Sequence, residues 1–152
     1  MAKFTDQKFV YTTYIKTTPE KLWKALTSPE FTRQYWFGID VNSDWKVGSA
    51  MKYVNKDGET LVQGKILAAN PFTLLSYTFH DEKNEDSTQE PPTKVTLEIE
   101  PELGTETVRL IVTHTDFVEN SKHLKNISAG WPAVLSGLKT YLETGKILAF
   151  EA

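Results

Sequence analysis

Alternating apolar and polar positions predict β-strands along most of the chain. In the clearest segment Val95, Leu97 and Ile99 are apolar, while the residues between them are polar. A strand with this pattern buries one face and leaves the other in water. The same alternation is found in three further segments, which are Phe9–Ile15, Leu75–Phe79 and Val108–His114.

Two short helices are predicted after the first of these strands. Residues 18–20 read Thr-Pro-Glu, which gives an N-cap residue, a proline at the first helical position and an acid in the first turn. Leu22 and Leu26 give this helix an apolar face. Residues 28–30, Ser-Pro-Glu, repeat the start signal and predict a second helix that ends at about Tyr35. The pair lacks a basic recognition face, which excludes a DNA-binding helix–turn–helix.

Turn residues divide the middle of the chain into an antiparallel meander. The strongest hairpin signal is Asp57-Gly58, which lies between the strand-like segments 51–54 and 60–67. Residues 80–92 are acidic and polar, and they predict a solvated hairpin loop without any residue to bury. Further turns are expected at residues 46–48, 70–71 and 103–104.

The end of the chain is predicted to form a long helix. Gly145 stands where a C-cap glycine belongs. Pro132 marks either the first turn of this helix or a kink just inside it. The tail 146–152 has two alternatives, in which its apolar residues dock on the core or the tail frays. The residues that recur at helical spacing are Trp131, Val134, Leu135, Leu138 and Leu142.

Composition places the chain among ordinary soluble proteins. Its 152 residues are 39% hydrophobic and carry a net charge of −3, and this length suits one domain, 1–152, with a core at about 8–145. The mild acidity gives no electrostatic drive toward nucleic acid or anionic membranes. No stretch approaches the roughly 18 apolar residues of a membrane span. The absence of cysteine removes disulfides and thiolate chemistry, and it fits a cytoplasmic location.

Together these elements predict an α+β fold. One strand, two short helices, about six further strands and a long C-terminal helix have to share one core. A curved antiparallel sheet with the long helix laid across its inner face satisfies that order. Such an arrangement often leaves space between the sheet and the helix, where a binding site would lie.

Several segments also resemble one protein family. They are Ile15–Glu30, Gly64–Leu67 with Asn70-Pro71, Thr113-His114 and Gly130–Leu135. In this order they resemble the START-like (Bet v 1-like, or SRPBCC) superfamily, and within it the branch related to the C-terminal domain of the activator of Hsp90 ATPase (AHSA1). The resemblance covers residues 8–145.

The resemblance implies a helix-grip fold, in which a curved seven-stranded antiparallel sheet wraps around a long C-terminal helix with an apolar cavity between them. Members include lipid and polyketide carriers, aromatase/cyclase enzymes, plant hormone-binding proteins and chaperone co-factors. Among small bacterial members of this branch the resemblance also implies small-molecule binding and a link with stress. Fold alone does not choose among these functions.

The inward-facing residues of the predicted sheet and helix form the candidate cavity wall. Residues 35–38 read Tyr-Trp-Phe-Gly, and three adjacent aromatic residues are hard to bury together. Two alternatives therefore stay open. Either Trp36 or Phe37 lines the mouth of the cavity, or these residues only pack in the core. The same alternation describes a filled core and a hollow one, so both stay open. The candidate ligand-binding residues are Trp36, Phe37, Met51, Val62, Ile66, Tyr77, Phe79, Leu97, Leu110, Val112, His114, Trp131, Leu135 and Leu138.

His114 is the most informative polar residue, because the alternation of residues 108–112 points it inward. One alternative is a core histidine that is hydrogen-bonded to a backbone carbonyl or a tyrosine. The other is a histidine that orients a hydroxyl or carbonyl group of a ligand. Tyr53 and Tyr77 could contribute hydroxyl groups in the same way.

Enzyme chemistry finds little support in the sequence. The three histidines, His80, His114 and His123, lack the spacing of metal ligands, and no phosphate-binding loop or serine-nucleophile motif is present. No cofactor and no metal are therefore expected, and binding is favoured over catalysis. A cyclase-like activity with His114 as acid or base stays open.

The function that the sequence favours is non-catalytic binding of a small, mostly apolar ligand of lipid, polyketide or flavonoid type. The alternatives are a protein-partner regulator that resembles an Hsp90 ATPase activator, and the cyclase-like enzyme. The expected partner is thus a small hydrophobic molecule or a protein, with no nucleic acid and no membrane insertion. The chain is expected to be a monomer or a weak dimer.

Overall fold

The computed structural model describes residues 3–149. The elements of this part of the chain are β1 (Phe9–Lys16), α1 (Pro19–Thr27), α2 (Pro29–Tyr35), β2 (Asp40–Ser43), β3 (Ala50–Val54), β4 (Thr60–Asn70), β5 (Leu74–Asp81), β6 (Thr93–Glu102), β7 (Thr107–Thr115) and α3 (Lys122–Thr144). The strands form one antiparallel sheet in the order β1-β7-β6-β5-β4-β3-β2. The predicted α+β helix-grip fold is confirmed, since two short helices follow the first strand and a long helix comes last.

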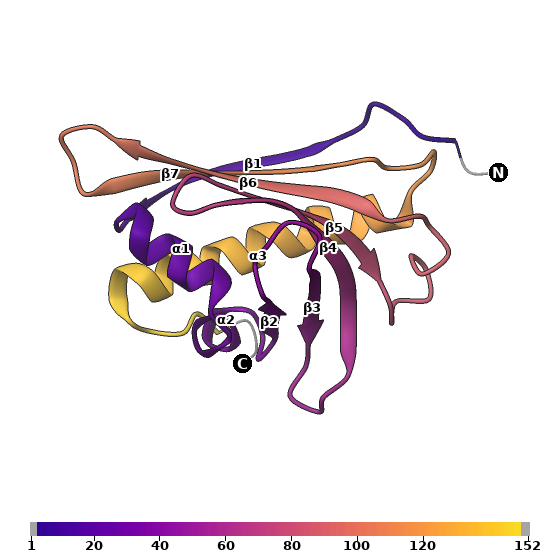
Figure 1. Ribbon diagram of the computed structural model, residues 1–152, viewed down its shortest axis with the longest axis horizontal. Coiled ribbons are helices and arrows are strands. Elements are labelled where there is room, and N and C mark those ends of the chain that lie inside the picture. Colours follow the sequence, from indigo (N-terminus) through magenta and orange to yellow (C-terminus); the bar gives the residue numbers. More distant parts are fainter. Residues whose placement is uncertain (1–2, 150–152) are drawn as a thin grey trace.

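The sheet curves so that its inner face surrounds α3. Figure 1 shows β1, β7 and β6 crossing above α3, while β3 and β4 turn downward beside it. Every second residue of β7 faces this core, so Val108, Leu110 and Val112 are buried, as the alternation predicts. The short helices α1 and α2 pack on each other, and α2 also packs on α3.

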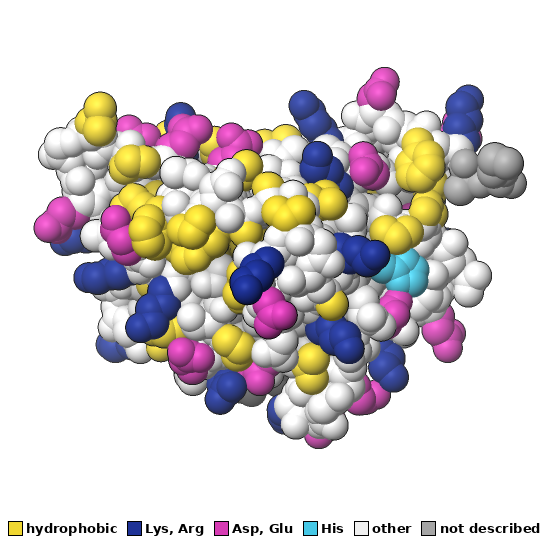
Figure 2. Space-filling model, viewed as in Figure 1, with side chains coloured by type: hydrophobic (Ala, Val, Ile, Leu, Met, Phe, Trp, Pro, Cys, Tyr) yellow, Lys and Arg dark blue, Asp and Glu magenta, His cyan; other side chains and the backbone are white. Residues whose placement is uncertain are grey.

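Charged side chains of both signs are mixed over the surface. In Figure 2, basic and acidic groups lie next to one another across the face shown, with apolar side chains between them. Exposed ion pairs join some of these groups, for example Lys83 with Glu59 at 3.0 Å. Within residues 3–149, no helix is both long enough and apolar enough to cross a membrane.

The predicted start signals of the two short helices are found at the predicted places. The N–H of Lys21 donates to Oγ1 of Thr18 at 3.2 Å, and Pro19 occupies the first turn of α1. Ser28 precedes α2 in the same way, although its side chain makes no capping hydrogen bond. The helix α2 ends at Tyr35, as predicted.

The long helix begins well before the apolar repeat that predicted it. It runs from Lys122 to Thr144, and Pro132 lies in its interior. The alternative that Pro132 belongs to the first turn is therefore wrong. At the other end the prediction is confirmed, because Gly145 adopts a φ of 75° and its N–H donates to the carbonyl of Tyr141 at 2.8 Å.

Side chains at the true start of α3 explain this difference. Oγ of Ser121 accepts the N–H of Leu124 at 2.9 Å. The carboxylate of Glu90 accepts the N–H groups of Lys122 at 2.9 Å and His123 at 3.2 Å, and it also accepts the hydroxyl of Ser121. These bonds satisfy N–H groups that have no partner inside the helix, and a negative charge is favourable at this end.

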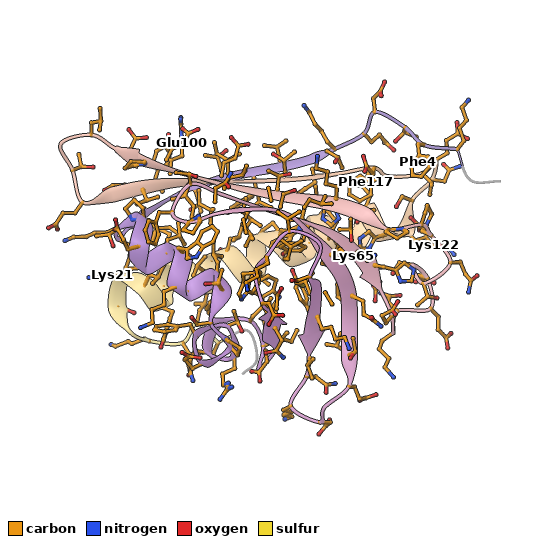
Figure 3. The ribbon with its side chains drawn as sticks, in the orientation of Figure 1. Phe4, Lys21, Lys65, Glu100, Phe117 and Lys122 are labelled. Atoms are coloured by element: carbon orange, nitrogen blue, oxygen red, sulfur yellow. The ribbon has the colours of Figure 1, made fainter. Side chains whose placement is uncertain are left out.

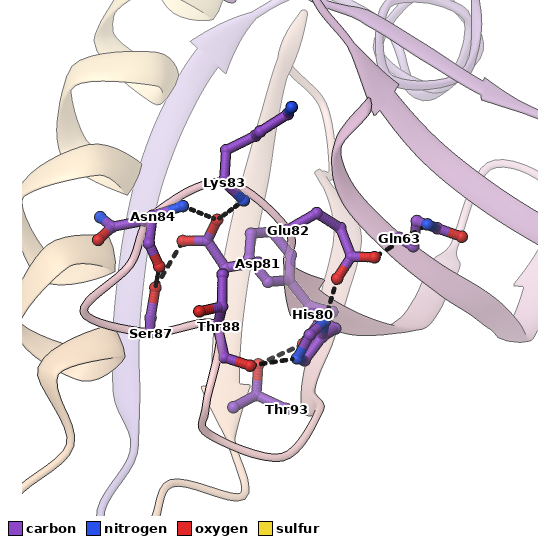
Figure 4. A network of polar contacts seen from close by, with 10 residues as sticks. Gln63, His80, Asp81, Glu82, Lys83, Asn84, Ser87, Thr88 and Thr93 are labelled. Atoms are coloured by element: carbon purple, nitrogen blue, oxygen red, sulfur yellow. Dashed lines mark hydrogen bonds and ion pairs between the residues drawn. The ribbon is translucent and has the colours of Figure 1, made fainter. Parts of the chain in front are cut away.

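The acidic loop is more strongly hydrogen-bonded than its composition predicts. Ser87 is only 2% exposed, which corrects the expectation that nothing in residues 80–92 is buried. Its hydroxyl donates to the carboxylate of Asp81 at 2.7 Å. Figure 4 shows the same carboxylate accepting the backbone N–H groups of Lys83 and Asn84. The loop is therefore folded onto the end of β5.

The tail after α3 does not dock on the core where the structure describes it. Ile147 and Leu148 are both exposed. Phe150, the third apolar residue of the tail, lies outside the described residues.

Gly64 allows β4 and β5 to approach each other closely. A Cβ atom at this position would lie 1.7 Å from the carbonyl oxygen of Thr78, which no real contact permits. Gly130 on α3 is different, because a Cβ atom there would meet no atom within 4 Å. The two glycines therefore make a matched pair for substitution by alanine.

We expect Gly64→Ala to lower the free energy of unfolding by about 3 kcal/mol or more, because the backbone of β4 or β5 has to move. Gly130→Ala should instead raise it by about 0.5–1 kcal/mol, because glycine is a poor helix former. Urea denaturation of both variants measures the two effects. Equal stability of Gly64→Ala and the unsubstituted chain would contradict the close approach.

Candidate functional site

A cavity of about 230 Å³ lies between α3 and the strands β3, β4 and β5. The connection between α2 and β2 closes one side of it. The wall is mostly aromatic and aliphatic, with few polar side chains. Its residues are Trp36, Phe37, Ile39, Tyr53, Leu61, Val62, Phe79, Asp81, His123, Asn126, Ile127, Gly130, Trp131 and Val134.

One stripe of α3 supplies the helical side of the wall. Residues three and four apart on a helix lie on the same face, and the α3 members of the wall follow this spacing. Gly130, in the middle of the stripe, has no side chain and so leaves open space there. The stripe comprises His123, Asn126, Ile127, Gly130, Trp131 and Val134.

Aromatic rings in edge-to-face contact form the opposite side. The ring of Trp36 lies 4.9 Å from that of Tyr53 and 5.6 Å from that of Trp131, measured between ring centroids. Tyr53 in turn lies 5.4 Å from Phe79. Such contacts favour a fixed arrangement over a deformable one. The wall is therefore built before any ligand arrives.

Phe37 borders the cavity. Its side chain is 58% exposed although it contributes to the wall, whereas the adjacent Trp36 is buried. The backbone of Phe37 has a φ of 52°, in the left-handed region that residues other than glycine rarely adopt. Both residues contribute to the wall, Trp36 as a buried ring and Phe37 as an exposed one, and which of them lines a mouth for a ligand stays a prediction.

His114 lies behind the cavity wall, and hydrogen bonds fix its ring. The indole N–H of Trp131 donates to Nδ1 of His114 at 3.0 Å. Because Nδ1 accepts, Nε2 carries the proton and donates to Oγ1 of Thr93 at 2.6 Å. The Thr93 hydroxyl donates onward to the carbonyl of Phe79 at 3.1 Å. Both ring nitrogens of His114 are therefore engaged inside the protein.

This end of the core is closed by the segment after β7. His114 packs against the ring of Phe117, with 5.0 Å between ring centroids, and Phe117 is fully buried. The backbone N–H of Thr5 donates to the carbonyl of Phe117 at 2.9 Å. Figure 3 shows Phe4, Phe117 and Lys122 at the same end of the sheet, where α3 begins.

His123 is the histidine that reaches the cavity. It is 3% exposed, and its Nε2 lies 3.4 Å from the same Thr93 oxygen. Since the Thr93 hydroxyl proton is directed to Phe79, Nε2 of His123 acts as the donor. Nδ1 then carries a lone pair, and it has no hydrogen-bond partner in the described part of the chain. Asn126, one turn further along α3, likewise has an unpartnered side-chain Nδ2.

Both core histidines are held in the neutral form by burial. Burial, and secondly the neighbouring His123, shift the pKa of His114 well below its ordinary value. Burial also lowers the pKa of His123. Asp81 and Glu90 oppose this shift, and His80 adds to it. The histidine at the cavity is therefore a neutral hydrogen-bonding group near pH 7.

Two tyrosine hydroxyls meet in the core beside the cavity, where Tyr53 belongs to the wall and Tyr77 lies behind it. The oxygens of Tyr53 and Tyr77 lie 2.5 Å apart in a buried hydrogen bond. Burial raises the pKa of both groups, so both stay protonated. The pair holds two O–H groups but uses only one of them in this bond.

Other candidate sites are less suited to an apolar ligand. A second hollow of about 240 Å³ is bordered by charged and polar residues of both signs, which are Lys16, Thr17, Thr18, Lys21, Glu106 and Glu143. In residues 3–149, no three His, Asp or Glu side chains are grouped so that they could hold a metal ion.

The structure brings five of the fourteen predicted residues to the cavity wall, namely Trp36, Phe37, Val62, Phe79 and Trp131. The other nine are buried in the core outside this wall, and they are Met51, Ile66, Tyr77, Leu97, Leu110, Val112, His114, Leu135 and Leu138. As ligand contacts, all fourteen stay predictions. The sequence reasoning missed His123 and Asn126, which continuing the helical spacing backward from Trp131 and from Val134, respectively, would have found.

We expect the free energy of unfolding to fall as the pH is lowered from 7.5 to 5.5. His114 and His123 have a lower pKa in the folded than in the unfolded chain, so the unfolded chain binds more protons below about pH 6.5. Each histidine contributes a slope of up to about 1.4 kcal/mol per pH unit. Urea titrations at several pH values measure it.

A His123→Gln variant is the control for this experiment, because it retains one of the two groups. Its slope should be smaller than that of the unsubstituted chain over the same pH range. A stability that is constant between pH 7.5 and 5.5 would contradict the assigned protonation states.

Comparison with known proteins shows which family the chain belongs to. The family model described as "Activator of Hsp90 ATPase homolog 1-like protein" matches residues 16–143. No curated protein sequence matches the chain significantly.

Solved structures share the fold at low sequence identity. The Aha1 dimer from Colwellia psychrerythraea is 22% identical with a TM-score of 0.73, over 92% of this chain and 98% of that one. PFC0360w, an Hsp90 activator from Plasmodium falciparum, is 19% identical with a TM-score of 0.72, over 89% and 95%. DynU16, from the dynemicin biosynthetic locus, is 19% identical with a TM-score of 0.76, over 94% of this chain and 49% of that one.

These identities show a common fold and nothing further about activity. The family match is stronger, because it spans most of the chain, including both short helices and nearly all of α3. The chain therefore belongs to the Activator of Hsp90 ATPase homolog 1-like family.

Proposed function

We propose that this protein binds a small, mostly apolar molecule in the cavity between the sheet and α3. The observation that supports this most directly is the wall itself, in which aromatic and aliphatic side chains surround about 230 Å³ and only a few polar groups interrupt them. This composition is typical of ligand pockets in proteins. Because the exposed Phe37 borders the space, a ligand has a path into it from solvent.

The volume limits the size of the ligand. Drug-sized ligands occupy pockets of about 300–1,000 Å³, and a cavity of about 150 Å³ binds benzene. The present cavity lies between these values, which fits one or two aromatic rings better than a whole flavonoid or lipid. Larger molecules of the polyketide type would have to extend past Phe37 into solvent.

Apolar burial would supply the driving force. An aromatic group the size of a Phe or Trp side chain buries about 150–250 Å². At about 25 cal/mol per Å² this gives about 4–6 kcal/mol before the entropy lost on association is subtracted. Apolar burial alone thus allows dissociation constants no lower than about 1 mM to tens of micromolar. Tighter binding therefore requires polar contacts in addition.

The geometry gives no support to a cyclase-like reaction through His114. Both of its ring nitrogens are hydrogen-bonded within the core, and its side chain does not contribute to the cavity wall. Binding without catalysis is the simpler function for this wall.

We expect naphthalene and toluene to shift the backbone amide NMR signals of cavity-wall residues in the unsubstituted chain. Gly130→Leu should weaken this binding at least tenfold, because the new side chain occupies space in the middle of the α3 stripe. Ala129→Leu is the matched control, since Ala129 is exposed and outside the wall. Its binding should be unchanged.

Two outcomes would contradict the proposed function. One is the absence of shifts with either probe while the spectrum shows a folded protein. The other is an equal effect of Gly130→Leu and Ala129→Leu, because binding would then not depend on the space in the cavity.

Regulation of a protein partner is a second candidate function, and one surface feature favours it. β1 is an edge strand of the sheet, and Val10 and Tyr14 on it are each 49% exposed. Apolar side chains on an unpaired edge are suited to contact another protein. The Plasmodium falciparum relative is an Hsp90 activator.

An ATPase assay tests this second candidate directly. If it is right, the chain should raise the ATPase rate of purified Hsp90, and a Val10→Lys, Tyr14→Lys double variant should raise it less. No change of the rate at saturating concentrations of the chain would exclude this function.

A further inference from the structure

Two unpartnered polar atoms lie on the α3 stripe of an otherwise apolar cavity. They are Nδ1 of His123 and Nδ2 of Asn126. His123 is 3% exposed, and both nitrogens are shielded on all sides in this conformation, so a ligand in the cavity reaches them only after a rotation of neighbouring side chains. Buried polar groups in folded proteins are nearly always hydrogen-bonded, so two exceptions on one cavity wall require an explanation.

The two atoms offer opposite hydrogen-bonding roles. Nε2 of His123 is directed to the Thr93 oxygen, which already uses its own proton on Phe79, so Nδ1 of His123 is left as an acceptor. Nδ2 of Asn126 is an amide nitrogen and can only donate. The two atoms are not within hydrogen-bond distance of each other, since neither has a partner. They are three residues apart on the helix, and so they lie on the same face.

A hydroxyl group matches this pair, because it donates one hydrogen bond and accepts others. We therefore propose that the ligand is a neutral hydroxylated aromatic molecule of one or two rings, whose hydroxyl donates to Nδ1 of His123 and accepts from Nδ2 of Asn126. This inference rests on the proposed function, and it names the class of ligand for the same cavity.

The charges around His123 argue against an anionic ligand. Asp81 contributes to the cavity wall, and Glu90 lies at the adjacent N-terminus of α3, where its carboxylate accepts the N–H of His123. Asp81 already accepts the Ser87 hydroxyl at 2.7 Å. Two carboxylates near the site repel a third, and neutral His123 supplies no compensating positive charge. An aromatic carboxylate is therefore expected to be rejected, whereas a phenol is accepted.

Four ligands with the same ring system separate these contributions. Naphthalene tests the apolar cavity alone, 1-methoxynaphthalene adds an acceptor without a donor, 1-naphthol adds both, and 1-naphthoate adds a negative charge. At pH 7.5 we expect 1-naphthol to bind at least tenfold more tightly than naphthalene or 1-methoxynaphthalene. We expect 1-naphthoate to bind more weakly than naphthalene.

Substitutions on α3 assign the effect to the two side chains. Asn126→Leu and His123→Phe should each reduce the preference for 1-naphthol over 1-methoxynaphthalene to less than threefold while naphthalene still binds. Lys125→Ala is the matched control, since Lys125 is exposed on the same helix and outside the wall. It should keep the full preference. If His123→Phe does not fold, Asn126→Leu alone decides, because Asn126 makes no hydrogen bond through Nδ2.

A direct reading of the ring nitrogen completes the experiment. In ¹H–¹⁵N spectra of the histidine side chains, the unprotonated Nδ1 signal of His123 should shift when 1-naphthol is added and stay in place with 1-methoxynaphthalene. Equal affinity of 1-naphthol and 1-methoxynaphthalene would overturn the hydroxyl assignment and leave apolar binding intact. Failure of all four ligands to bind would overturn the proposed function and the ligand class together.

Discussion

The hydroxyl group of Thr93 makes three hydrogen bonds that join four elements of the fold. It donates to the carbonyl of Phe79 on β5 and accepts ring N–H groups from His114 on β7 and His123 on α3. Thr93 itself begins β6. One oxygen atom thus sets how closely the first turn of α3 approaches the sheet, and with it the width of the cavity. In buried surroundings the loss of this oxygen would leave two ring N–H groups without an acceptor, which is costly.

The parts of the fold that were predictable from sequence depend on local signals. The Asp57-Gly58 turn and the Thr18 cap involve neighbouring residues, and strand alternation follows from the geometry of a single strand. The start of α3 was not predictable in this way, because Glu90, which accepts its first N–H groups, comes from a distant loop. An acidic residue in a polar loop carries no sign of the helix that it will cap. The protonation and orientation of His123 likewise depend on Thr93, which is remote in the sequence.

Alternation also reports which face a residue occupies, but not how far away the opposite layer lies. Val62 and Val112 both face inward from their strands, yet only Val62 borders the cavity. The difference arises across the gap, where α3 presents Gly130 to one region and Leu135 and Leu138 fill the other. For this reason the fold class could be predicted, whereas the extent of the site required the relative placement of sheet and helix.

The left-handed backbone at Phe37 lowers the stability of the fold and places an aromatic side chain beside the cavity. Phe37 and Gly38 both have positive φ values, of 52° and 77°. Glycine adopts this conformation freely, whereas a residue with a Cβ atom pays about 1–2 kcal/mol for it. Selection for stability alone would favour glycine or asparagine at position 37. The exposed aromatic ring of Phe37 thus stands beside the cavity at a conformational cost, which the surrounding fold has to offset.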